Sequence, residues 1–88
     1  MKLIIPKKLL EELEKEAGEI APVECCGFLL GRKSNTEFFI KKVLHAKNIL
    51  ESHTRFDIDP QEIYDAVSTA EKENLELIGF YHSHPGFI

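Results

Sequence analysis

Residues 25–31 (CCGFLLG) are almost wholly apolar, and this run constrains the fold more than any other part of the sequence. A strand that carries no polar side chain on either face must be buried on both faces. The chain has 88 residues, which is the size of one small domain with a modest core. The run therefore predicts a single domain over residues 1–88, built around a strand that is covered on both sides.

Two helices are indicated by apolar residues at a spacing of three to four. In residues 6–17 the apolar positions fall on one helical face, and Gly18 is expected to end the helix. The rest of this helix is rich in Lys and Glu and is expected to be solvated. The second helix begins at Asp59, because Pro60 suits its first position and Glu62 completes a pattern similar to a capping box.

The remaining segments read as strands. They are a short apolar strand at 2–5, a β-rich strand at 36–47 and a strand at 75–83 that leads into a His-Ser-His-Pro sequence. Residues 32–35 form the turn that pairs 36–47 with the apolar run as a hairpin. The order strand–helix–hairpin–helix–strand predicts an α/β fold, a mixed sheet with packed helices.

Charge and composition exclude several classes of protein. The net charge is −4 and basic residues form no cluster, which argues against binding to nucleic acid. No apolar run reaches the roughly 20 residues of a membrane span, and the N-terminal residues do not form a signal peptide. We therefore expect a cytoplasmic protein with no membrane partner. The charged residues are mostly Lys and Glu, which is typical of a thermophilic source.

His82 and His84 form the sharpest chemical motif. On a strand, residues i and i+2 project from the same face, with Cα atoms about 6.5–7 Å apart. Two imidazoles at that spacing can bind one zinc ion. Pro85 ends the strand where the histidines would emerge, because proline cannot donate a ladder hydrogen bond. The alternative is that both histidines are structural and half-buried.

Glu24 is the second candidate, because it is the one acidic residue in an otherwise apolar stretch. A carboxylate placed before a buried strand either has a partner or has a raised pKa, and a raised pKa suits a general base. The alternative is a solvated loop glutamate. Gly27, near the start of the strand, can permit a close approach of another group to the backbone.

The other cysteines and histidines favour structural roles. Cys25 and Cys26 are potential zinc ligands, but we expect one or both to be small buried hydrophobic residues. His45 is expected to be a structural histidine. His53 lies in a polar segment and is expected to be exposed.

These motifs together resemble the JAMM/MPN+ (JAB domain) zinc metalloprotease family, and most closely its compact prokaryotic branch. The resemblance covers nearly the whole chain, in the same order. It is carried by residues 22–31 (PVECCGFLLG), Asn48, residues 56–60 (FDIDP) and residues 79–85 (GFYHSHP).

The resemblance implies a cytidine-deaminase-like α/β fold and a zinc-dependent peptidase or isopeptidase. His82 and His84 would be zinc ligands, and Glu24 would be the general acid/base that acts on the zinc-bound water. The substrate would be the peptide or isopeptide bond after the C-terminal tail of a ubiquitin-like or sulfur-carrier protein. Which carrier protein or leaving group is used does not follow from the motifs.

The family pattern continues beyond the histidine pair, with a serine and then an aspartate that is the third zinc ligand. The sequence ends at Ile88, before either position, so we expect a domain that is incomplete at its C-terminus. Three interpretations stay open. In the first, the chain is a fragment of an intact peptidase. In the second, another chain completes its site, for example in a homodimer through the exposed strand 75–83. The third is an inactive MPN-type module that binds partner proteins.

Overall fold

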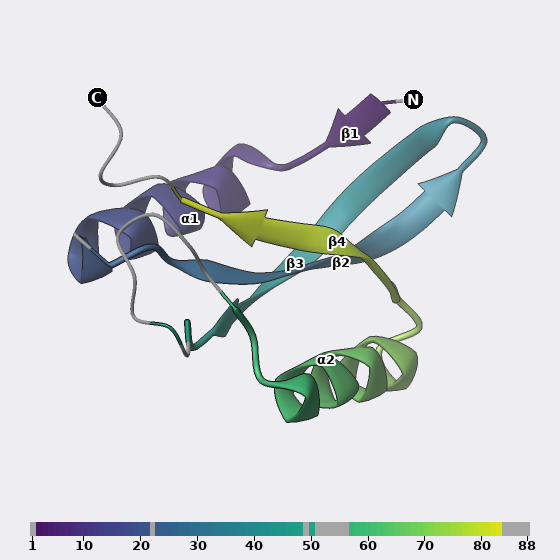
Figure 1. The fold of residues 1–88 in the computed structure, drawn as a ribbon. Coiled ribbons are helices and arrows are strands. Elements are labelled where there is room, and N and C mark those ends of the chain that lie inside the picture. The colour runs from purple at the N-terminus through teal and green to yellow at the C-terminus, as the bar shows by residue number, and fades with distance from the viewer. Residues whose placement is uncertain (1, 22, 49, 51–56, 84–88) are drawn as a thin grey trace.

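The computed structural model describes residues 2–21, 23–48, 50 and 57–83 (Figure 1). The elements in chain order are β1 (Lys2–Ile4), α1 (Lys7–Ile20), β2 (Cys26–Ser34), β3 (Glu37–Ala46), α2 (Pro60–Lys72) and β4 (Glu76–His82). In this part of the chain the strands form one sheet in the order β1-β3-β2-β4. The sheet is mixed, because β1 runs parallel to β3 and the other pairs are antiparallel. The predicted α/β class is confirmed.

Strand β2 lies inside the sheet, as the apolar run predicts. It pairs with β3 as the expected hairpin and with β4 on its other side. The hairpin is longer than expected, since β2 continues to Ser34 and the turn falls at Asn35, which has a positive φ of 55°. Asparagine tolerates the left-handed conformation that a tight turn needs.

The two faces of β2 pack against different helices. Cys26, Phe28 and Leu30 belong to one buried cluster, together with Ala66 and Ala70 of α2. Leu29 belongs to the other cluster, with Ile40 and Val43 of β3, and Leu9 and Leu13 of α1 pack against it. Because side chains alternate along a strand, every β2 residue from Cys26 to Leu30 faces either α1 or α2.

The helix boundaries agree with the capping signals at one helix and differ at the other. At α2, Asp59 is the N-cap, and its Oδ1 accepts a hydrogen bond of 2.9 Å from the Gln61 backbone N–H. The expected end of α1 at Gly18 is wrong, because the helix continues to Ile20. Glycine inside a helix costs only about 1 kcal/mol relative to alanine, and packing of the apolar face of α1 tolerates that cost.

In the described residues, no helix has the length and apolar character needed to cross a membrane.

Candidate functional site: a buried glutamate against a histidine

The fold brings Glu24 and His82 together although 58 residues separate them in sequence. Glu24 lies just before β2, and His82 is the last residue of β4, where it pairs with Cys26. The Nδ1 atom of His82 lies 2.8 Å from Oε1 of Glu24. The Glu24 side chain is 1% exposed, whereas that of His82 is 36% exposed. The pair therefore joins a buried carboxylate to an imidazole that reaches the surface.

Two hydrogen bonds hold the ends of β2 and β4 beside each other at this point. The Cys25 N–H donates to Oγ of Ser83 at 2.9 Å, and the Ser83 N–H donates to the Cys25 carbonyl at 3.0 Å. These bonds join the residue after Glu24 to the residue after His82. They therefore fix the relative position of the two strand ends that carry the site.

Asn48 holds the backbone of Glu24 from the other side. Its side-chain Nδ2 donates to the Glu24 carbonyl at 3.0 Å, and its Oδ1 accepts from the backbone N–H groups of Leu50 and Asp57. Asn48 is buried. Sequence reasoning cites Asn48 only within the family resemblance and assigns it no role, because a lone asparagine carries no local signal of burial.

The contact between His82 and Glu24 determines what the imidazole can do. A neutral imidazole carries a proton on one ring nitrogen, and the hydrogen bond made by one nitrogen selects the form. With Nδ1–H donating to the carboxylate, the lone pair lies on Nε2. Metal-binding histidines in other proteins show the same arrangement, in which a carboxylate on one ring nitrogen fixes the orientation of the ring.

The remaining sequence candidates are two histidines and two cysteines. His84 and His53 fall outside the described residues. Cys25 and Cys26 are buried, as expected, and burial raises the pKa of the Cys26 thiol to about 11. A thiol with so high a pKa is a poor nucleophile and a poor metal ligand near neutral pH.

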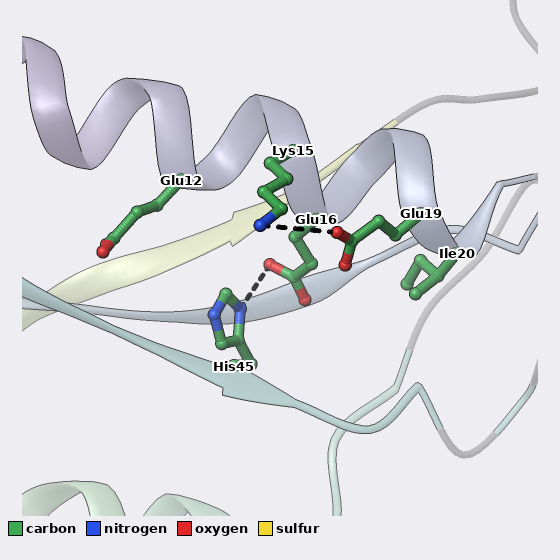
Figure 2. A pocket seen from close by; sticks show the side chains of 6 residues that line it. All are labelled: Glu12, Lys15, Glu16, Glu19, Ile20 and His45. Atoms are coloured by element: carbon green, nitrogen blue, oxygen red, sulfur yellow. Dashed lines mark ion pairs between the residues drawn. The ribbon is translucent and has the colours of Figure 1, made fainter.

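His45 does not join Glu24 and His82. It lies on β3 and its Nδ1 is 2.6 Å from Oε1 of Glu16 on α1 (Figure 2). The same carboxylate oxygen accepts a hydrogen bond of 2.6 Å from the hydroxyl of Tyr81. The expectation that the Lys/Glu-rich side of α1 is solvated is therefore wrong for Glu16, whose side chain is only 12% exposed. Sequence reasoning missed this cluster because its members come from three separate elements.

The donors at the site are compatible with zinc in type. Zinc in proteins accepts imidazole nitrogen, which His82 provides at Nε2, while the Glu24 carboxylate contacts the other ring nitrogen. Across the described ranges, however, no group of three His, Cys, Asp or Glu side chains could hold a metal ion together. Within those ranges, His82 is the candidate ligand, and a complete zinc site would need further ligands from residues outside them.

A mixed sheet between two helices, with a buried glutamate and a histidine at adjoining strand ends, defines a small α/β domain of the JAB class. The model for "Prokaryotic homologs of the JAB domain" matches residues 6–87. The chain belongs to this family, which confirms the resemblance seen in the sequence.

Individual relatives agree with the family assignment. The chain is 40% identical over 82 residues to a desampylase from Pyrococcus furiosus, covering 93% of this chain and 55% of the relative. It is 33% identical over 84 residues to a probable TtuB-protein conjugate cleaving protease from Thermus thermophilus, covering 94% and 53%. The chain thus spans about half the length of these relatives.

A solved structure confirms the fold. The solution structure of protein DSY2949 from Desulfitobacterium hafniense superposes with a TM-score of 0.87 at 33% sequence identity. The match covers 97% of this chain and 57% of that protein.

Proposed function

We propose that this protein is a zinc-dependent peptidase or isopeptidase that cleaves the bond after the C-terminal tail of a ubiquitin-like or sulfur-carrier protein. The observation that carries the proposal is the contact of 2.8 Å between the buried Glu24 carboxylate and His82. The substrate class is supported by two relatives, which are named a desampylase and a probable TtuB-protein conjugate cleaving protease.

His82 and His84 would hold the metal. When bound, zinc supplies a Lewis acid that polarises the scissile carbonyl and favours attack by water. Glu24 takes the proton from the attacking water and passes it to the leaving amine, as a general base and then a general acid.

The experiment that tests this function is removal of the metal. The substrate is a fusion in which a carrier-type tail is followed by a short reporter peptide, and mass spectrometry identifies the bond that is cut. We expect cleavage by zinc-loaded protein, loss of at least about 100-fold of the rate after chelation, and recovery with zinc but not with magnesium. Cleavage that persists after chelation would contradict a zinc mechanism. A protein that holds one zinc ion per chain and cleaves no substrate would contradict it as well.

We also propose that the free edge of β4 supports self-association. Among the described strands, β4 pairs with β2 alone and lies at the end of the sheet. Phe80 in its centre is 49% exposed. An exposed edge strand with a large apolar side chain is a ready site for pairing with a second copy.

The expected result is a dimer in sedimentation velocity at micromolar concentration. Phe80→Lys should shift the population to monomer, because a charge on an edge strand opposes pairing. Tyr64→Lys is the matched control, since Tyr64 is an even more exposed aromatic residue, on α2. If both variants sediment like the original protein, pairing through β4 is excluded.

A further inference from the structure

We propose that Glu16 and His45 are positioning residues that hold the Tyr81 hydroxyl and, through Tyr81, fix the end of β4 that carries His82. The proposal deepens the proposed function, because it names what sets the geometry of the Glu24–His82 pair. It concerns residues on the opposite side of the sheet from that pair.

One carboxylate oxygen lies at the centre of the cluster. Oε1 of Glu16 lies 2.6 Å from the Tyr81 hydroxyl oxygen and 2.6 Å from Nδ1 of His45, and these two atoms are 3.1 Å apart. Glu16 belongs to α1, His45 to β3 and Tyr81 to β4. A single carboxylate, whose side chain is only 12% exposed, thus connects the helix to two strands that do not pair with each other.

The Tyr81 ring packs closely against β2, while its hydroxyl contacts α1. Tyr81 pairs with Gly27, and a Cβ atom added at Gly27 would lie 2.5 Å from both Cε2 and the hydroxyl oxygen of Tyr81. Any larger residue at position 27 would push the ring away, and it would also meet the backbone oxygen of Leu44 on β3. Gly27 follows Glu24 by three residues, so the ring lies across the strand that carries the buried carboxylate.

The cluster acts on His82 through the backbone. Tyr81 packs against the buried cluster under α1, whereas Cys26, the pairing partner of His82, belongs to the cluster under α2. Neighbouring residues on a strand point to opposite faces, so the Tyr81 side chain points away from the imidazole. When the Tyr81 ring and hydroxyl are held in place, the backbone of β4 at residue 81 has a fixed position and twist. The direction of the next side chain, His82, is then restricted as well.

The chemistry of the cluster keeps the hydroxyl in place as a donor. The hydroxyl donates to the Glu16 carboxylate, with the two oxygens 2.6 Å apart. Hydrogen bonds to a charged acceptor are roughly twice as strong as neutral ones. His45 adds a second contact to Glu16 from the rim, where it lines a surface hollow of about 450 Å³ (Figure 2).

The test is Tyr81→Phe, which keeps the ring over Gly27 and removes only the hydroxyl. In metal-free protein, the imidazole ¹⁵N resonances of His82 report its contact with Glu24 directly. We expect these resonances to shift toward those of an imidazole without that contact, and the zinc Kd to rise about tenfold, as for other groups that orient a metal ligand. Tyr64→Phe is the matched control, because Tyr64 is exposed and should leave both readouts unchanged.

A second pair of variants tests the Glu16 carboxylate itself. Glu16→Gln keeps an acceptor oxygen and should disturb His82 less than Glu16→Met, which keeps a similar volume without an acceptor. That graded rescue is not expected if Glu16 merely fills space.

The outcome that overturns the inference is a Tyr81→Phe protein with a lower melting temperature but unchanged His82 resonances and zinc affinity. Tyr81 would then serve packing alone. Failure of the proposed function is a separate result. If the original protein binds no zinc, the resonances of the metal-free protein still decide whether the cluster positions His82.

Discussion

Replacing Glu24 by glutamine is expected to lower kcat/KM for a carrier-tail substrate by about 10²–10⁴-fold, which is the range that general acid–base groups contribute. Glutamine matches the volume of glutamate, so it fits the buried position without a cavity. Its amide cannot accept a proton from water at neutral pH, and it therefore removes the exchange on which the proposed mechanism depends. The rate is measured from progress curves, with thermal melting to verify that the variant is folded.

Glu14→Gln is the matched control, because it makes the same chemical change at an exposed position on α1. We expect its kcat/KM to stay within about twofold of the original. The assignment of Glu24 is wrong if the glutamine variant keeps more than about a tenth of the activity while binding zinc normally. In that case Glu24 would act only as the group that orients His82.

Replacing His82 by alanine has the second large expected effect, and it acts on both metal binding and stability. Zinc affinity should fall at least about 100-fold, because the variant lacks the imidazole that we propose as a metal ligand. The free energy of unfolding should fall by about 1–3 kcal/mol, which is the usual cost when a buried polar group loses a hydrogen-bond partner. Competition titration with a zinc-binding dye and urea unfolding measure the two effects.

His82→Asn separates these two effects. The asparagine amide N–H can donate to Glu24 from nearly the position of Nδ1, but the side chain is a poor zinc ligand. We expect this variant to recover much of the lost stability and none of the zinc affinity. Zinc affinity equal to that of the original protein in both variants would remove His82 from the metal site.

Local patterns were sufficient to predict most of the secondary structure. The apolar run at 25–31 predicts a strand buried on both faces, and the structure gives β2 between α1 and α2. Asp59 predicts the start of α2, because capping depends on atoms only a few residues apart. The end of α1 was predicted wrongly at Gly18, since glycine permits a helix to stop but does not force it to.

The family motifs also single out Glu24 and His82, yet the sequence cannot state their distance. That distance depends on the register Cys26↔His82 and on the bonds between Cys25 and Ser83, which only the assembled sheet provides.

The sequence by itself determined which segments become helices and strands, because periodicity, caps and turns are set by neighbours along the chain. The tertiary structure alone decided that Glu16 is largely shielded from solvent, that His45 contacts it and that Tyr81 lies across Gly27. Glu16 and His45 look like ordinary surface residues in the sequence, since burial is a property of the elements packed around a side chain. Contacts between residues 29 and 65 positions apart arise only when the sheet and α1 come together.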